Sequence, residues 1–85
     1  MTMTITVAFF AGAAEAAGMD STTLTPPAGG TVDALTTHLV ADNPALDGVL
    51  GRCSVLLDGA RVADPEQARL QDGSEVHYLP PFAGG

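Results

Sequence analysis

The sequence predicts an α+β fold in which one mixed β-sheet packs against one main helix. Three observations support this prediction: apolar residues alternate with period two in several short segments, one segment has helical periodicity, and turn-forming residues separate them. In chain order the expected elements are strand, strand, helix, strand, short strand and strand. In so short a chain, this order favours a last strand that lies beside the first, in the middle of the sheet.

The first part of the chain contains two strands joined by a short helical turn. Residues 2–10 are β-branched or aromatic at alternate positions, which indicates a strand. Residues 11–18 are rich in alanine and close on Gly18, so we expect a helical turn there. Residues 19–25 then return as the hairpin partner of the first strand.

The main helix is expected over residues 32–41, after a breaker rich in proline and glycine. Thr31 supplies an N-cap hydroxyl, and Asp33 places a negative charge in the first turn, where the helix dipole favours it. The apolar stripe of this helix, which we expect to pack against the sheet, consists of Val32, Leu35, Leu39 and Val40.

The second half of the chain contains three further strands, at residues 53–57, 61–63 and 75–79. The turn signals before the last two of these strands are Asp58-Gly59 and Asp72-Gly73. Residues 45–52 form a connection whose apolar side chains are expected to tuck under the helix.

Side-chain alternation assigns the strand residues to two faces of the sheet. The side chains expected to face the helix are Ile5, Val7, Phe9, Val55, Leu57, Val76 and Tyr78. The opposite face holds Phe10, Leu56, His77 and Leu79, and no second long helix is available to cover it. Three of these four residues are apolar on a face where polar residues are expected, so we interpret the four as a docking patch for a partner protein.

Charge and composition narrow the class of protein. The 85 residues are enough for one domain, predicted over residues 1–80, with residues 81–85 as a flexible C-terminal arm. The net charge is −7, from ten acidic residues against three arginines and no lysine. Binding of nucleic acid needs a basic surface, so that function is disfavoured, whereas an acidic surface suits a basic partner protein.

The sequence also predicts a cytoplasmic location. A single cysteine, Cys53, cannot form an internal disulfide, which is typical of a reducing compartment. The first residues lack the basic segment of a signal peptide. No apolar run reaches the roughly 20 residues of a membrane helix.

The usual active-site patterns are missing from the sequence. His38 and His77 have no cysteine or glutamate at metal-ligand spacing, and no serine lies in a G-x-S-x-G motif. Cys53 opens a predicted strand, where we expect a small core residue. The sequence therefore predicts no metal site, no bound cofactor and no catalysis by the chain alone.

The chain ends in Gly84-Gly85, and this diglycine is its most informative motif. With no Cβ on either residue, such an end can extend and thread a narrow channel in a partner's active site. The Gly85 carboxylate becomes an electrophile when it is converted to an acyl-adenylate, and a sulfur nucleophile can then displace AMP to leave a thiocarboxylate. This chemistry predicts a sulfur carrier.

The residues before the diglycine are expected to prepare the arm for a partner. Pro80 and Pro81 stiffen its base, because each proline ring fixes the backbone angle φ. Phe82 and Ala83 are expected to anchor the arm in the partner, while the diglycine reaches the chemistry.

Several segments together resemble the ubiquitin-like β-grasp sulfur carriers, most closely the small subunit of molybdopterin synthase. The similarity covers nearly the whole chain: TITVAFFA followed by Glu15 and Gly18, then TVDALTTHLV, VLLDG and LQDGSEVHYLPPFAGG. Its specific part is the ending D-G-x-E-V-x-x-x-P-P-x-x-G-G. The resemblance implies a ubiquitin-like β-grasp fold.

The resemblance also implies two protein partners. An ATP-dependent activating enzyme would adenylate Gly85, and sulfur transfer would then give the thiocarboxylate. The large subunit of molybdopterin synthase would accept residues 82–85 in its active site. There the carrier would donate sulfur to a precursor pterin in molybdenum cofactor biosynthesis. Phe10 and Leu79 fall where the family has apolar contacts with these partners.

Two positions depart from the family's pattern. Ala14 stands where arginine is frequent, and Arg61 stands where an apolar partner contact is common. Both positions concern the partner interface, and neither changes the chemistry expected of the diglycine.

Other functions share the Gly-Gly end. Related carriers supply sulfur for thiamin, cysteine or secondary metabolites; the Pro-Pro before the arm favours the molybdopterin branch, and thiamin carriers are usually shorter. A ubiquitin-like modifier would instead be conjugated through Gly85 to lysines of target proteins. A third alternative is an interaction module in which the diglycine has no role.

Overall fold

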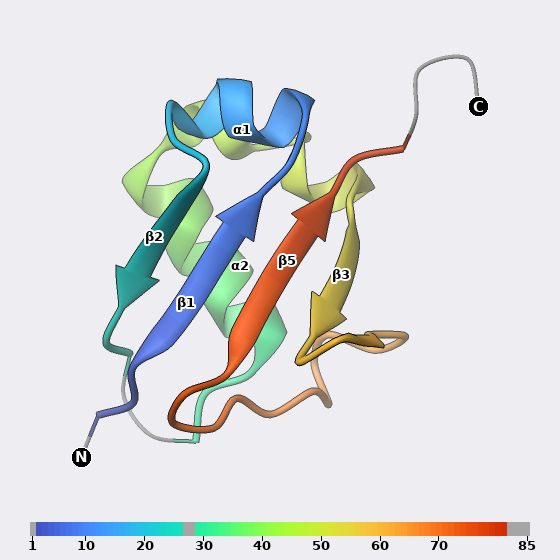
Figure 1. The fold of residues 1–85 in the computed structure, drawn as a ribbon. Coiled ribbons are helices and arrows are strands. Elements are labelled where there is room, and N and C mark those ends of the chain that lie inside the picture. The colour runs from blue at the N-terminus through green and yellow to red at the C-terminus, as the bar shows by residue number, and fades with distance from the viewer. Residues whose placement is uncertain (1, 27–28, 82–85) are drawn as a thin grey trace.

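The computed structural model describes residues 2–26 and 29–81 of the chain. The described residues form β1 (Ile5–Phe9), α1 (Gly12–Ala17), β2 (Ser21–Leu24), α2 (Val32–Asp42), β3 (Ser54–Leu57), β4 (Ala60–Arg61) and β5 (Glu75–Leu79). Short 3-10 helices η1 (Pro44–Leu46) and η2 (Leu50–Arg52) connect α2 to β3. Figure 1 shows that α2 crosses one face of the sheet and that α1 lies at one end of it.

The strands form one mixed sheet in the order β2-β1-β5-β3-β4. β5 runs parallel to β1 and antiparallel to β3, while β2 and β4 pair antiparallel at the two edges. The last strand therefore lies beside the first in the middle of the sheet, as the sequence predicts. This α+β arrangement is the ubiquitin-like β-grasp that the resemblance implies.

The first hairpin has shorter strands than the sequence predicts. β1 begins at Ile5, although the preceding Met3 is buried and its N–H donates to the carbonyl oxygen of Pro26 at 2.9 Å. Between β1 and β2 the predicted helical turn is present as α1, and Gly18 closes it in the left-handed conformation, with φ of 74°. Glycine adopts this conformation without the steric cost that a Cβ adds.

The edge strand β4 begins one residue before the predicted range 61–63. Asp58 and Gly59 both have positive φ, of 50° and 85°, which is the geometry of a two-residue hairpin turn. This tight turn closes at once, so Leu57 pairs directly with Ala60. The strand therefore occupies Ala60–Arg61.

The main helix matches its prediction closely. The Thr31 side chain accepts a hydrogen bond from the Ala34 N–H at 3.2 Å and caps the first turn. At the other end the helix continues to Asp42, where the following Asn43-Pro44 terminates it. The predicted apolar stripe is buried at Val32, Leu35 and Leu39 and half-buried at Val40.

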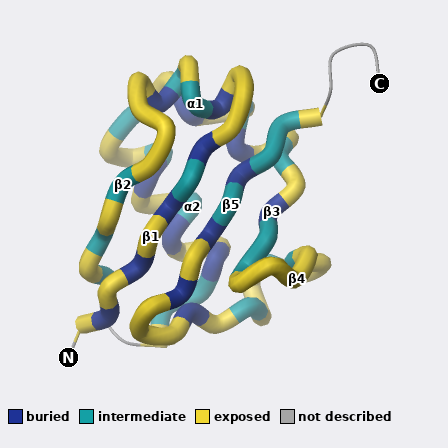
Figure 2. The backbone as a smooth tube through the Cα atoms, viewed as in Figure 1, coloured by how far each residue is buried: buried dark blue, intermediate teal, exposed yellow. Residues whose placement is uncertain are grey.

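The core lies between α2 and the sheet face that alternation predicts. Buried residues alternate with exposed or half-buried residues along β1 and β5 (Figure 2). The side chains that this face buries are Ile5, Val7, Phe9, Val55, Val76 and Tyr78. Leu57, expected among them, is only half-buried because it is the last residue of β3, beside the hairpin turn. In the connection, Leu46 and Leu50 are buried, as expected.

One polar contact lies within this core. The Tyr78 hydroxyl is 2.7 Å from the Thr36 hydroxyl, which also bonds the Val32 carbonyl oxygen one helical turn earlier. The Tyr78 ring stacks on Phe9 with 5.8 Å between ring centroids. Burial raises the pKa of Tyr78 to about 12, although the bond to Thr36 acts in the opposite direction. Tyr78 thus links the central strand to the helix.

No helix in the described part of the chain combines the length and the hydropathy that crossing a lipid bilayer requires.

We expect Leu39→Ala to lower the free energy of unfolding by about 2–5 kcal/mol, because it leaves a cavity between helix and sheet. Urea denaturation followed by circular dichroism measures the change. His38→Ala is the control, since His38 is exposed on the same helix and should change stability by no more than about 0.5 kcal/mol. A loss as small as the control's would show that the buried face of α2 is assigned wrongly.

We also expect alkaline pH to destabilise the fold through Tyr78. Its folded pKa of about 12 lies above the ordinary value of 10.0, so the unfolded chain loses this proton first. Stability from this group is therefore complete below about pH 10 and is lost as pH rises through about 12. Denaturation midpoints measured over this range should fall less steeply in Tyr78→Phe, which has no phenol to ionise. If the midpoint fell equally steeply with pH in both proteins, the alkaline loss of stability would not come from Tyr78.

Candidate functional site

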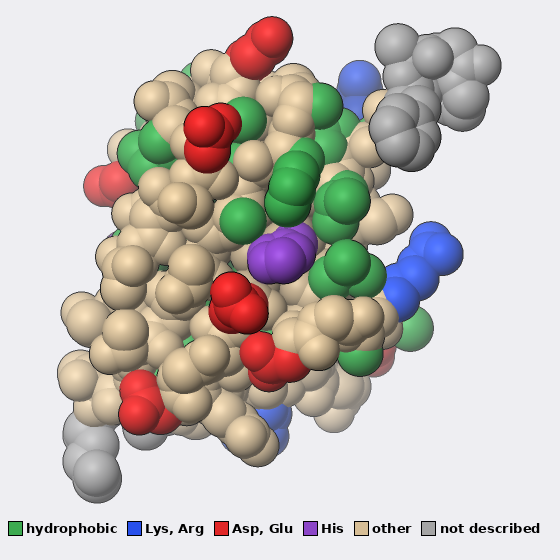
Figure 3. Space-filling view, in the orientation of Figure 1, with side chains coloured by type: hydrophobic (Ala, Val, Ile, Leu, Met, Phe, Trp, Pro, Cys, Tyr) green, Lys and Arg blue, Asp and Glu red, His purple; other side chains and the backbone are tan. Residues whose placement is uncertain are grey.

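The docking patch lies on the sheet face opposite α2, at the end where the chain leaves β5. The strand register pairs Leu56 with His77 and Ser54 with Leu79. Phe10 follows β1, and its N–H donates to the carbonyl oxygen of Tyr78 at 3.2 Å. Its ring lies 5.6 Å from the His77 ring, centroid to centroid. The four predicted residues therefore form one continuous group, and Figure 3 shows hydrophobic side chains above and to the right of the histidine, with an acidic side chain below it.

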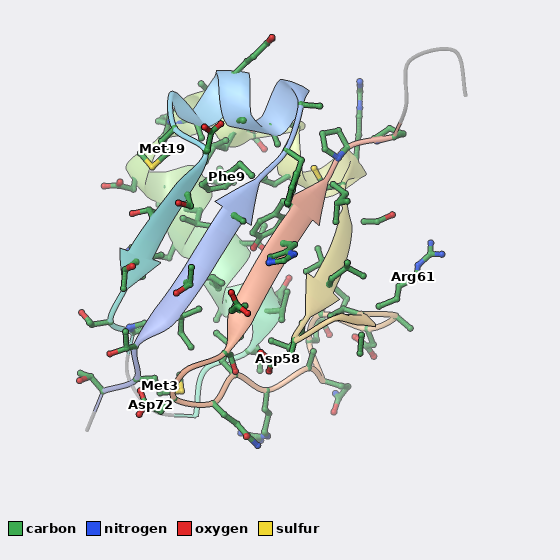
Figure 4. The ribbon with its side chains drawn as sticks, viewed as in Figure 1. Met3, Phe9, Met19, Asp58, Arg61 and Asp72 are labelled. Carbon is green, nitrogen blue, oxygen red and sulfur yellow. The ribbon has the colours of Figure 1, made fainter. Side chains whose placement is uncertain are left out.

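Exposure differs within the patch. Phe10 is 43% exposed, whereas Leu56, His77 and Leu79 are half-buried because neighbouring strands cover part of each side chain. The other large apolar side chain that is strongly exposed in the described residues is Met19, at 46%. Met19 lies just before β2, the edge strand that β1 separates from β5 (Figure 4), and no sequence pattern singles it out. Phe10 is thus the most accessible part of the patch.

The arm begins beside the patch. Pro80 is half-buried and Pro81 is exposed, and both line a shallow groove of about 360 Å³ together with Val49 and Arg52. The residues predicted to carry the chemistry, Phe82, Ala83, Gly84 and Gly85, lie outside the described residues. The structure therefore places the base of the arm at the end of the central strand, and the roles of these four residues stay predictions.

Cys53 has the features of a structural residue. It is half-buried, and its thiol donates to the Val49 carbonyl oxygen with a sulfur–oxygen distance of 3.3 Å. Burial raises the pKa of this thiol, which disfavours the thiolate and with it nucleophilic attack. Among residues 2–26 and 29–81, no three His, Cys, Asp or Glu side chains gather as metal ligands.

Charged side chains border the patch on two sides. Glu75, exposed on β5, shares the open face with His77, because residues two apart in a strand point the same way. Arg61 on β4 pairs with Leu56 across the edge of the sheet. The sequence predicts Arg61 in a short edge strand, and the two-residue Asp58-Gly59 turn fixes its register opposite Leu56.

Comparison with known proteins agrees with the fold and the ending of the chain. The family model of the ThiS family matches residues 7–85. The molybdopterin synthase sulfur carrier subunit of Chlamydomonas reinhardtii is 35% identical over 83 residues, which make up 98% of this chain and 100% of that protein.

Solved structures show the same similarity. The Haloferax volcanii HVO 2177 protein matches with a TM-score of 0.86 and 32% identity, covering 99% of this chain and 88% of that one. Small archaeal modifier protein 1 of Haloferax volcanii matches with a TM-score of 0.83 and 28% identity, covering 96% and 99% of the two chains. The similarity thus extends over nearly the full length in each case.

The adjacent residues Phe9 and Phe10 provide a direct test of the two faces. Phe9 is 3% exposed, so Phe9→Ala should lower the free energy of unfolding by about 3–5 kcal/mol. Phe10→Ala should cost about 1 kcal/mol or less, because this ring is already largely in water. Thermal and urea denaturation of both variants measure the difference. Similar losses would show that Phe10 belongs to the core and not to the patch.

Proposed function

The chain belongs to the ThiS family, and on this premise we propose that it is a sulfur carrier for molybdopterin synthesis. The observation that carries the proposal is the match over the full length to a protein named as the sulfur carrier subunit of molybdopterin synthase. The region that the family model matches, residues 7–85, includes the diglycine, which is the group that the chemistry requires. We place this activity in the cytoplasm.

In the proposed reaction the protein supplies a carboxylate and its partners supply the catalysis. An oxygen of the Gly85 carboxylate attacks the α-phosphorus of ATP and releases pyrophosphate, which gives an acyl-adenylate. A hydrosulfide-type nucleophile then forms a carbon–sulfur bond as the carbon–oxygen bond to AMP breaks. Gly84 and Gly85 allow the arm to enter narrow active sites, because neither has a side chain. The carrier itself binds no cofactor in this scheme, and ATP belongs to the activating enzyme.

The fold supports this role by separating the docking patch from the reactive end. Phe10, Leu56, His77 and Leu79 would contact the activating enzyme and then the large synthase subunit. Pro80 and Pro81 direct the arm from the end of the central strand toward the partner's active site, where Phe82 and Ala83 would anchor it. A rigid base with a narrow tip suits chemistry that takes place inside another protein.

The composition protects the activated end from the chain itself. The sequence has no lysine, so no ε-amine is available to capture the acyl-adenylate. The thiol of Cys53 is partly buried with a raised pKa, which keeps it from competing as a nucleophile. The activated carboxyl group is therefore left for the sulfur nucleophile.

A second candidate function is that of a ubiquitin-like protein modifier. The similarity to small archaeal modifier protein 1 favours it, because that protein is named as a modifier. Both functions begin with adenylation of Gly85 and differ in the nucleophile, which is sulfur for a carrier and a lysine amine for a modifier.

Coexpression with the activating enzyme of the same organism, followed by intact-mass measurement, tests the proposal. A carrier gains the mass difference between one sulfur and one oxygen atom, whereas a modifier gives isopeptide conjugates to other proteins. Deletion of Gly85 should abolish the mass change, and so should replacement of Gly84 by a bulky residue, while circular dichroism and melting stay normal. A variant without Gly85 that still supports cofactor synthesis would show that the carrier proposal is wrong.

A further inference from the structure

Arg61 occupies a fixed position at the rim of the docking patch. The β3–β4 hairpin pairs Arg61 with Leu56, and the next strand pairs Leu56 with His77. Arg61, Leu56 and His77 therefore form one row across the open face of the sheet. A partner that covers Leu56 and His77 must also come close to the Arg61 side chain.

The guanidinium of Arg61 is available to such a partner. Arg61 is exposed, and no carboxylate of residues 2–26 and 29–81 lies within ion-pairing distance of it. The acidic residue of its own hairpin, Asp58, uses its side chain to accept the Glu75 N–H at 2.8 Å. In Figure 4, Arg61 extends outward from the edge of the sheet while Asp58 lies at the base of β5.

The other two arginines of the chain lie elsewhere on the surface. Arg69 donates to the Gly29 carbonyl oxygen at 3.3 Å and lies beside the start of α2, away from the patch. Arg52 lines the groove at the base of the arm together with the carboxylate-bearing Asp47. Arg61 is thus the arginine that the strand register places in one row with the patch residues Leu56 and His77, in a chain of net charge −7.

We propose that Arg61 determines partner specificity by pairing with a carboxylate on the surface that covers the docking patch. A guanidinium presents a planar set of donors that matches a carboxylate with two parallel hydrogen bonds. A partner that buries the patch with no acceptor at this point would leave the guanidinium poorly solvated, which disfavours that partner. Glu75, on the same face below His77, adds the opposite charge, so the pattern also favours one orientation of the partner.

The inference rests on the proposed function for the identity of the partners. These are the activating enzyme and the large synthase subunit, each of which would carry an apolar surface with an aspartate or glutamate beside it. The net negative charge of the rest of the chain has little effect on the pairing of Arg61 with a partner's carboxylate, because charges more than about 10 Å apart are largely screened at moderate salt.

Calorimetric titration of the full chain against these two proteins tests the inference. Arg61→Glu should weaken binding to at least one of them about tenfold, and Arg61→Gln by about two- to fivefold. Arg69→Glu is the matched control, with the same change of charge outside the patch, and should change binding less than about twofold. The effect of Arg61→Glu should shrink as salt is raised, because added ions screen a contact at the rim. Melting curves check that each variant is folded.

The outcomes separate this inference from the proposed function. Equal affinities for Arg61→Glu and Arg69→Glu would overturn the role of Arg61, even if Phe10→Ala, titrated in parallel, weakens binding and supports the patch. Absence of binding by the natural sequence to either protein would overturn both the docking patch and the Arg61 contact. The mass change on coexpression reports on the sulfur-carrier proposal independently, since it is read from Gly85 and not from affinity.

Discussion

The parallel pairing of β1 with β5 is the contact on which the rest of the molecule depends. It pairs the first strand with the last. Val7 lies beside Val76 and Phe9 beside Tyr78, and all four side chains are buried. A parallel pair needs a long connection, and here every other element lies within that connection. Because β5 is paired on both sides, the arm departs from the central strand of the sheet and not from an edge.

Two aspartates fix where this central strand begins. The Asp72 side chain accepts the Thr4 N–H at 2.8 Å while the Gly73 N–H donates to the Thr4 carbonyl oxygen at 2.8 Å. Asp58 and Glu75 form a similar reciprocal pair. The Asp58 side chain accepts the Glu75 N–H at 2.8 Å, and the Asp58 N–H donates to the Glu75 carbonyl oxygen at 2.9 Å. These contacts lie on both flanks of the start of β5, and Figure 4 shows the two aspartates at this end of the sheet. A shift of one residue would exchange the two faces of the strand.

The sequence was sufficient to predict the fold because its local signals agree with one another. Alternation assigns Val76 and Tyr78 to the core and His77 to the open face, and helix caps and Asp-Gly turns mark the boundaries. The contact between Tyr78 and Thr36 could not be predicted in this way, because Thr36 is defined as a core partner only by the packing of α2. The burial of Met3 likewise depends on its pairing with Pro26, which alternation does not reveal.

The outline of the candidate site was also predictable from side-chain alternation. The extent to which each patch residue is exposed was not, because it depends on tertiary packing. Periodicity places Phe10, Leu56 and Leu79 on one face but does not show how far neighbouring strands cover them. Leu56 and Leu79 prove to be half-buried, so their remaining exposed area is small. The position of Arg61 depends on one turn type, since a longer loop after Leu57 would place a different residue opposite Leu56.

This partial burial determines how the patch can act. Full burial of an apolar side chain stabilises by roughly 1.5–3 kcal/mol, so covering Phe10 and the remainder of Leu56 and Leu79 gives less than three times that value. Association itself costs about 4–15 kcal/mol, a range that absorbs most or all of this gain, so the patch alone gives weak binding at best. A rim charge such as Arg61 contributes mainly to orientation and to the rate of encounter. Under the proposed function, lasting association would depend on insertion of the arm into the partner. A carrier held in this way would separate once the arm is withdrawn, as the proposed visits to two enzymes require.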